Sequence, residues 1–240
     1  MVTGIGVSGG IALGPAFVLR PSGTGPRFPE ERRSPEEEEK RLWDAHAKVC
    51  LALEQEAEEA RRRAETETEV ILLGYAALLR DPEIRAEMEE SLQDGMSARE
   101  TMDTVWDERI RRWSQGPVRL QERIPDLQDL KRMLRDALCP SASPEPPHES
   151  ILVVPHLSAS DLMRFRPLEG VVCERGTRGS HVAVLLREAG IPAVFGVPSA
   201  TERMNSGTRL LLDGDRGAVF PDPEPDFLQR FFRERETGAK

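Results

Sequence analysis

Cysteine is scarce in this sequence, which has three among its 240 residues. Cys50, Cys139 and Cys173 lie far apart, and no pair has the Cys-x-x-Cys spacing. This pattern argues against both a disulfide framework and a cysteine-based zinc site. A sparse, odd count is typical of proteins that work in the reducing cytosol.

Long apolar runs and a basic leader are also lacking. No stretch approaches the roughly 20 apolar residues that a bilayer-spanning helix needs. The first 17 residues, MVTGIGVSGGIALGPAF, have neither the basic start nor the unbroken apolar core of a signal peptide. We therefore expect a cytoplasmic protein.

Positive charge is in the minority, since 33 Lys and Arg residues face 42 Asp and Glu residues, for a net charge of −9. Contacts to nucleic-acid phosphates need Lys and Arg, so a nucleic-acid partner is disfavoured. The charge suits a basic protein partner, or it simply keeps the surface soluble. Apolar residues at 38% and charged residues at 31% indicate a globular chain.

The middle of the chain, residues 30–139, is charged and has apolar residues at helical spacing. Ser34 followed by Pro35 and acidic residues predicts a helix start, and the helical pattern continues to Leu79. New helices are predicted to start at Asp81 and Ser97, and a last one covers about 125–138. Short turns between amphipathic helices predict a helical bundle.

A proline-rich stretch, residues 140–147, marks a domain boundary, and a compact α/β region follows. A helix is predicted over His181–Ala189, a shorter one after Ser158 or Ser160, and a final one over about 225–235. The predicted strands of this region are Ile151–Val154, Gly170–Cys173, Ala193–Phe195, Arg209–Leu212 and Ala218–Phe220.

The segment Glu174-Arg-Gly-Thr-Arg-Gly-Ser-His181 carries the most chemical information. A strand ends, a glycine-containing loop turns, and Ser180 precedes a helix whose first residue is His181. Glycines let backbone N–H groups approach an anion, and a helix N-terminus favours negative charge. Arg178 adds a fixed cation with several donors. The pattern predicts a phosphate-binding loop with an imidazole nucleophile in it.

A less specific interpretation stays open, because a single histidine at a helix N-terminus is often only a surface or capping residue. Of the other histidines, His46 is expected to be solvated and His148 to be inert in the linker. His156 follows a strand end and serves either the same site or only its own loop. Asp213 and Asp215 are expected in a turn between strands rather than in a metal site.

The residues from Glu174 to Gly196 resemble the active-site signature of the PEP-utilising enzymes, in which a Gly-Gly-Arg-Thr-Ser-His core is followed by a helix and Gly-Ile-Pro-Ala-Val. The run from Leu212 to Val219 is similar to the hairpin that closes that domain. The start, Gly4 to Ala16, and the run from Leu78 to Ile84 resemble the N-terminal half of phosphoenolpyruvate-protein phosphotransferases, enzyme I of the bacterial phosphotransferase system.

This resemblance implies an α/β swivelling phosphohistidine domain with an inserted all-α helical bundle subdomain. The α/β domain would comprise residues 1–20 plus 148–222. The inserted helical subdomain, which would bind a carrier protein, would comprise residues 30–139. Residues 223–240 would form a C-terminal linker helix.

The resemblance also implies a phosphotransferase of the sugar phosphotransferase system. His181 would accept phosphate that originates from phosphoenolpyruvate and pass it to an HPr-type phosphocarrier protein. No cofactor is expected in this chain, because Mg²⁺ and phosphoenolpyruvate would bind a C-terminal barrel domain. That barrel is the second expected partner, beside the carrier protein. The residues expected to support the phosphate are Arg178, Ser180, Gly179, Gly176 and Thr177.

The sequence departs from the family pattern at several places. Thr177 replaces a glycine, Gly179 replaces the usual threonine, and Val182 replaces a common Thr or Ala. In the helical subdomain, the residues expected to bind the partner are Tyr75, Leu78, Leu79, Gln128 and Lys131. Three of them, Tyr75, Gln128 and Lys131, also depart from the family pattern. Two alternatives therefore remain, a non-catalytic module that docks a carrier, and the corresponding domain of another PEP-utilising enzyme.

Overall fold

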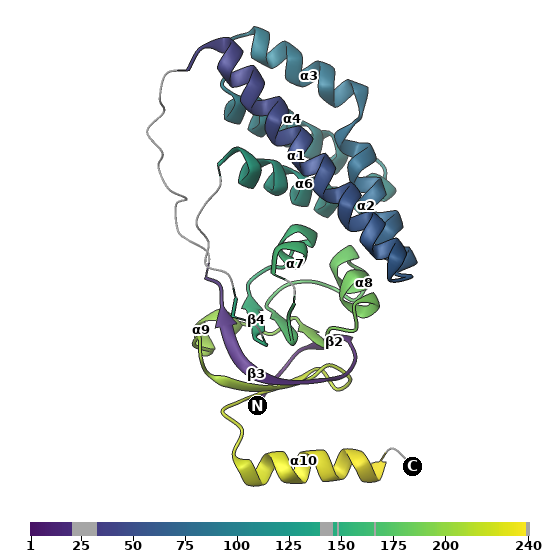
Figure 1. Ribbon diagram of the computed structural model, residues 1–240, viewed down its shortest axis with the longest axis vertical. Coiled ribbons are helices and arrows are strands. Elements are labelled where there is room, and N and C mark those ends of the chain that lie inside the picture. Colours follow the sequence, from purple (N-terminus) through teal and green to yellow (C-terminus); the bar gives the residue numbers. More distant parts are fainter. Residues whose placement is uncertain (21–32, 140–145, 148, 166, 239–240) are drawn as a thin grey trace. The chain divides into compact units, whose positions relative to one another are not determined.

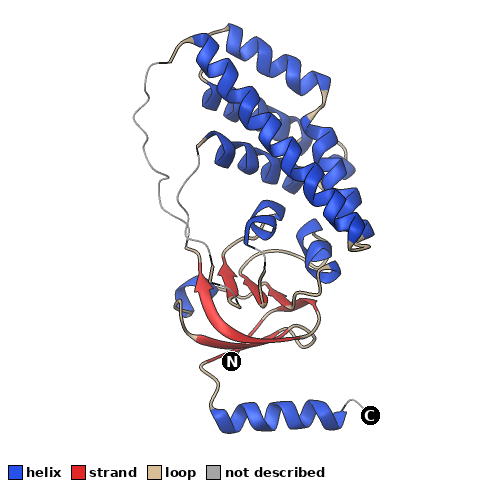
Figure 2. Cartoon of the chain, viewed as in Figure 1, coloured by secondary structure: helices blue, strands red, loops and turns tan. Residues whose placement is uncertain are grey.

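The computed structural model describes residues 1–20, 33–139, 146–147, 149–165 and 167–238. The chain divides into two compact units (Figure 1). One, the α/β unit, combines Met1–Gly23 with Pro144–Lys240. The other, the helical unit, is Thr24–Ser143. Figure 2 shows that the strands of the described residues gather in the α/β unit, with helices outside them.

The α/β unit is built on one eight-stranded sheet with the order β1-β8-β7-β3-β4-β5-β6-β2. Strands β3 to β6 run parallel, and the other neighbours are antiparallel. Strands β4 and β5 are buried along their whole length, as their continuous apolar runs predict. The strands are β1 Val2–Thr3, β2 Ile5–Ser8, β3 Ile11–Val18, β4 Ile151–Val154, β5 Gly170–Cys173, β6 Ala193–Phe195, β7 Arg209–Asp213 and β8 Ala218–Pro221.

The sheet curls back on itself, because its first strand, β1, and its last, β2, are separated by a single residue, Gly4. The Gly4 N–H donates to the carbonyl of Gly217 at 2.8 Å. A Cβ at Gly6 would collide with the carbonyl oxygen of Gly214, and a Cβ at Gly214 with that of Ser8. Only glycine permits backbones to lie this close, so these residues allow the sheet to become a nearly closed, barrel-like structure.

The expected fold class, an α/β swivelling phosphohistidine domain with an inserted all-α helical bundle, is wrong. The observed architecture is a mixed α/β fold whose eight strands form one nearly closed sheet, and this fold does not by itself define a phosphohistidine domain. The prediction missed the closure because it depends on backbone contacts between strands far apart in sequence, which local patterns do not report.

Helices α7 (Ala159–Phe165) and α8 (His181–Glu188) lie on one side of the sheet, and α10 (Pro225–Gly238) lies on the other (Figure 1). The short helix α9 (Ala200–Arg203) was not predicted from the sequence. Arg235 of α10 pairs with the buried Asp213 at 2.9 Å and also with Asp215. The ion pairs attach α10 to the turn between β7 and β8.

The helical unit packs amphipathic helices around fully buried side chains such as Trp106, Leu53 and Leu127. Ser34 and Ser97 form capping boxes, in which the serine hydroxyl accepts from the third backbone N–H of the helix and a glutamate bonds back. The helices are α1 Pro35–Arg62, α2 Thr66–Leu79, α3 Pro82–Gln93, α4 Ala98–Ser114, α5 Val118–Gln121 and α6 Ile124–Leu138.

Two details of the helical unit differ from the sequence expectation. The helical pattern that ran to Leu79 is broken between α1 and α2, where Ala64 has a φ of 61°. His46 is half-buried rather than solvated, and its Nε2 lies 2.8 Å from the carbonyl oxygen of Leu79. Burial lowers the pKa of His46, which favours the neutral ring. None of the helices in the described residues is long and apolar enough to span a membrane.

We expect Gly6→Ala to lower the free energy of unfolding of the α/β unit by about 3 kcal/mol or more, because the added methyl group meets backbone rather than a movable side chain. All three tryptophans, at positions 43, 106 and 113, belong to the helical unit, so their fluorescence would miss this change. Native-state amide hydrogen exchange of strands β3 and β7 measures it instead.

Gly74→Ala is the matched control, since a Cβ at Gly74 in α2 meets nothing within 4 Å. It should raise the stability of the helical unit by up to ~1 kcal/mol and leave exchange from the strands unchanged. Wild-type exchange rates in Gly6→Ala would contradict the described contact between β2 and the β7–β8 turn.

Candidate functional site

The loop that follows β5 holds the candidate site. The parallel strands β4 and β5 end at the same edge of the sheet, and backbone hydrogen bonds continue beyond them. The N–H of Glu174 donates to the carbonyl of Val154 at 3.0 Å, and that of Arg175 donates to Pro155 at 3.2 Å. The start of the loop is therefore fixed against the segment after β4. Carboxyl ends of parallel strands are where α/β proteins commonly bind ligands.

His181 is the first residue of α8 and is half-buried. Ser180 precedes it with extended backbone angles, and its hydroxyl accepts from the N–H of Ala183 at 3.3 Å. The same hydroxyl donates to the carbonyl of Thr177 at 3.0 Å. Ser180 thus caps the helix and also ties it to the loop. The first N–H groups of a helix and its dipole favour an anion at this end.

The other residues expected to support a phosphate lie in the same exposed loop. Gly176 has a φ of 131°, and a Cβ there would come within 2.6 Å of the Phe195 ring, so glycine is required. At Gly179 a Cβ would meet nothing within 4 Å. Thr177 contributes its backbone carbonyl to the capping serine. Thr177 therefore supports the helix cap through its backbone carbonyl and not through its hydroxyl.

Arg178 is exposed, but its side chain is anchored. Its Nε donates to the carbonyl of Gly6 in β2 at 2.6 Å. A guanidinium carries five N–H donors, so this contact leaves most of them for a second acceptor such as a phosphate. The structure thus brings His181, Ser180 and Arg178 together within one loop and one helix end.

Arg187, at the far end of α8, is a further residue of the site that the sequence pattern does not indicate. Its Nη1 donates to the carbonyl of Val7 at 3.2 Å and to that of Arg178 at 3.0 Å. A second such residue is Ser8 of β2, whose hydroxyl donates to the carbonyl of Leu186 at 3.3 Å. No local signal identifies the contacts with Val7 and Ser8, since these partners are about 180 residues away in sequence.

Cys173, at the end of β5, is a second nucleophile near the loop, and its Sγ lies 2.9 Å from the carbonyl oxygen of Arg175. Burial raises the pKa of this thiol to about 11. It therefore stays protonated at neutral pH, and a thiol is a poor nucleophile. The imidazole of His181 is the better candidate.

The remaining candidates of the α/β unit occupy other positions. His156 is exposed in the segment after β4. Asp213 is the last residue of β7 and Asp215 lies in the β7–β8 turn; the carboxylate of Asp213 accepts from two N–H groups of that turn. His148 lies outside the described residues. Within the described residues no group of three or more His, Cys, Asp or Glu could hold a metal ion.

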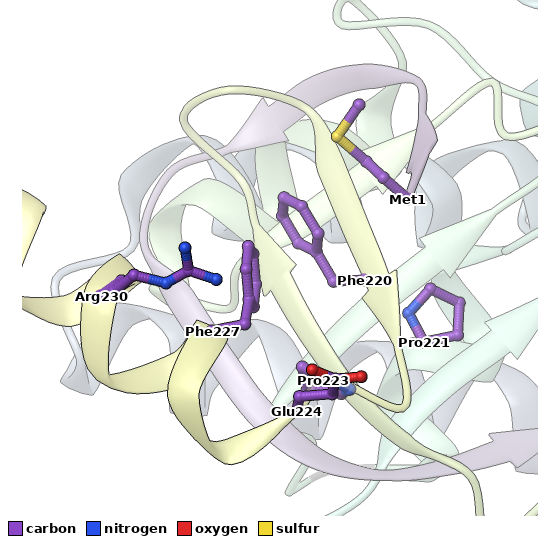
Figure 3. Close-up of a pocket in the computed structure, with 7 residues that line it drawn as sticks. All are labelled: Met1, Phe220, Pro221, Pro223, Glu224, Phe227 and Arg230. Atoms are coloured by element: carbon purple, nitrogen blue, oxygen red, sulfur yellow. The ribbon is translucent and has the colours of Figure 1, made fainter.

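A pocket of the α/β unit lies between β8 and α10, apart from the His181 loop (Figure 3). Phe220 and Phe227 form much of its wall, and their ring centroids are 4.9 Å apart. Arg230 is the one Lys or Arg in its lining, and that lining has no His or Cys. The full lining is Met1, Phe220, Pro221, Pro223, Glu224, Phe227 and Arg230.

The residues expected to bind a partner lie in the helical unit, and they differ in exposure. Tyr75 and Leu79 are each 1% exposed and belong to the core. Tyr75 donates to Asp126 at 3.2 Å, and burial raises the pKa of its hydroxyl. Leu78 is half-buried and Gln128 is exposed. A partner can therefore contact the last two directly, but Tyr75 and Leu79 only through their neighbours.

Lys131, the last residue expected to bind a partner, forms ion pairs within the helical unit. The Lys131 ammonium pairs with Asp103 at 3.1 Å and with Asp107 at 2.6 Å, both on α4. On α2, Val70 and Leu73 are 65% and 43% exposed, and Ala77 is exposed as well. Their spacing places these three side chains on one face of the helix. An exposed apolar helix face is typical of a docking surface.

Two family models match the chain. The model described as "PEP-utilising enzyme, N-terminal" matches residues 3–123, and that described as "PEP-utilising enzyme, mobile domain" matches residues 146–217. The second match contains the whole loop from Glu174 to His181.

Curated relatives point the same way. The phosphoenolpyruvate-protein phosphotransferase of Mycoplasma pneumoniae is 27% identical over 90% of this chain and 39% of the relative. The protein of that name from Streptomyces coelicolor is 29% identical over 96% of this chain and 42% of the relative. The chain thus spans about two fifths of the length of these relatives. The resemblance to the N-terminal half of such enzymes is confirmed.

A solved structure described as the N-terminal domain of Enzyme 1 - Nitrogen superposes with a TM-score of 0.71 at 27% identity, covering 98% of this chain and all of that one. A solution structure of Enzyme I, at 23% identity, has the same fold, with a TM-score of 0.69. The mixed α/β architecture described above is therefore that of an Enzyme I N-terminal domain.

We expect Ser180→Ala to destabilise α8 by about 1 kcal/mol, because the N–H of Ala183 loses its acceptor. Ser180→Asp is the matched control, since aspartate caps a helix about as well as serine. Amide exchange from the first turn of α8 distinguishes them: it should accelerate in the alanine variant only. Equal exchange in both variants would show that the hydroxyl does not hold the helix start.

Proposed function

The chain belongs to the family of PEP-utilising enzymes, and on that premise we propose that it relays a phosphoryl group through His181 in a phosphoenolpyruvate-dependent sugar phosphotransferase system. One observation carries the proposal: His181 opens α8 directly after the loop in which Arg178 is anchored to Gly6 of β2. A nucleophile, a helix N-terminus and a guanidinium stand within four residues of one another.

The chemistry needs little from the protein beyond position and charge. A lone pair of the neutral imidazole forms a phosphorus–nitrogen bond as the phosphorus–oxygen bond of phosphoenolpyruvate breaks, and the electron pair leaves with the enolate oxygen. The ring keeps its proton on the other nitrogen. Arg178 and the N–H groups at the start of α8 balance the charge on the phosphoryl oxygens. Transfer onward breaks the same bond as a carrier histidine attacks.

We propose an HPr-type phosphocarrier protein as the acceptor, docked on the helical unit. The apolar face of α2, with Val70, Leu73 and Ala77, supports this assignment. Gln128 of α6 offers a polar contact within the same unit. The net charge of −9 favours a carrier with a basic docking face.

Phosphoenolpyruvate and Mg²⁺ are proposed to bind a further domain, a C-terminal barrel, rather than the residues of this chain. This chain covers about two fifths of its relatives, such as 39% of that from Mycoplasma pneumoniae. Its own basic residues at the site, Arg178 foremost, suit a phosphoryl group rather than the whole substrate. In isolation it should exchange phosphate with a phosphorylated carrier but not label itself from phosphoenolpyruvate.

His181→Ala should abolish acid-labile phosphorylation of the chain by phosphorylated HPr-type carrier, because no other nucleophile takes that position. Phosphopeptide mapping by mass spectrometry locates the label. His46→Gln is the control; it removes a histidine of the helical unit and should keep full labelling. Native-state amide exchange of strands β3 and β7 checks that the α/β unit of His181→Ala is folded, and exchange from α4 and α6 checks the helical unit of His46→Gln.

Two outcomes would overturn the proposal. Undiminished labelling of His181→Ala would assign the phosphoryl group to another residue. Binding of the carrier to the wild-type chain with no transfer at all would favour a non-catalytic docking module.

Leu73→Glu should raise the carrier concentration needed for half-maximal transfer by about tenfold, because a charge enters the centre of the apolar α2 face. Val118→Glu is the matched control, since Val118 is 68% exposed on α5, outside that face. The maximal transfer rate should stay at the wild-type level in both. If the two variants raise the carrier concentration for half-maximal transfer equally, α2 is not the docking face.

A further inference from the structure

Strand β2 carries the contacts that hold the candidate site. Three of its four residues bond to the His181 segment. The carbonyls of Gly6 and Val7 accept from Arg178 and Arg187, and the hydroxyl of Ser8 donates to the carbonyl of Leu186. Strand β2 is also the last strand of the sheet, so one side of its backbone has no neighbouring strand among the described residues. In an edge strand such carbonyls would otherwise bond to water, and here the two arginine side chains donate to them.

The pairing of β2 with β6 explains how consecutive carbonyls become available. Gly6 pairs with Val194 and Ser8 pairs with Ala193, so Val7 is an extra residue in β2. Such a bulge interrupts the regular alternation of hydrogen bonds and re-aims local groups. Bulges are over-represented at sheet edges and beside active sites.

Arg187 joins three segments through one nitrogen. Its Nη1 donates to Val7 in β2 at 3.2 Å and to the carbonyl of Arg178 in the loop at 3.0 Å, while its own backbone is in α8. Arg178 is therefore held twice, by its carbonyl through Arg187 and by its Nε through Gly6. The two arginines together fix the loop immediately before the capping Ser180.

We propose that Arg187 is a positioning residue for phosphoryl transfer at His181, and that it acts through Arg178. This inference rests on the proposed function, and it assigns to Arg187 the alignment of the Arg178 guanidinium. Arg187 is committed to backbone carbonyls, whereas Arg178 keeps donors for the phosphoryl oxygens. Loss of Arg187 releases the carbonyl of Arg178 and lets the guanidinium drift from its place at the carbonyl of Gly6.

The test compares Arg187→Gln, Arg178→Gln and the double variant in transfer from phosphorylated HPr-type carrier to the full chain. Arg187→Gln should lower the maximal rate roughly ten- to a hundredfold, as misplacement of about 1 Å does at other sites. The KM for the carrier should stay unchanged, because docking is on the helical unit. Arg203→Gln, an exposed arginine of α9, is the matched control and should transfer at the wild-type rate.

A double-mutant cycle separates positioning from mere stability. If Arg187 acts through Arg178, its removal should cost little further rate in the Arg178→Gln background. Additive losses, or an Arg187→Gln rate equal to that of Arg203→Gln, would overturn the proposal. A wild-type chain that accepts no phosphate would instead refute the proposed function.

A second readout does not depend on transfer. The Nε–H of Arg178, which donates to Gly6 at 2.6 Å, should give a distinct, slowly exchanging resonance in ¹H–¹⁵N spectra. In Arg187→Gln that resonance should shift and exchange faster, while in Arg203→Gln it should not. An unmoved resonance in Arg187→Gln would show that Arg187 does not hold Arg178, whatever the chain's activity.

Discussion

The structure of the α/β unit depends on one close backbone contact, between Gly6 in β2 and Gly214 in the β7–β8 turn. This contact brings the last strand of the sheet against the far end of the same sheet, so that β2 has a fixed place although it pairs with only β6. The carbonyls of β2 can then hold Arg178 and Arg187, and through them the loop before His181. The glycines at the chain's start therefore serve the site at residue 181.

Much of the local structure could be predicted from the sequence. Strands β4, β5 and β6 have the predicted bounds, and Ser180 caps a helix that His181 opens, because apolar runs and capping residues act over a few residues. The closed sheet, the bulge at Val7 and the contact of Arg187 with β2 could not be predicted, since each joins segments 180 or more residues apart. Burial of His46 was missed for the same reason.

The unusual loop sequence becomes understandable from the contacts. A glycine at 179 has open space around it, and Thr177 contributes a backbone carbonyl that any residue would supply. The departures from the family pattern therefore leave the helix cap and the Arg178 anchor intact. The proposed carrier docking uses the helical unit and the proposed chemistry uses the α/β unit, so the variants proposed for each should change different kinetic constants.

Native-state hydrogen exchange tests the central claim most directly, which is that β2 holds the start of α8. The account predicts that the amides of β2 and those of Ala183 and Val184 exchange through the same cooperative opening, with the same free energy and the same denaturant dependence. A lower-energy opening of β2 that leaves the first turn of α8 protected would contradict it.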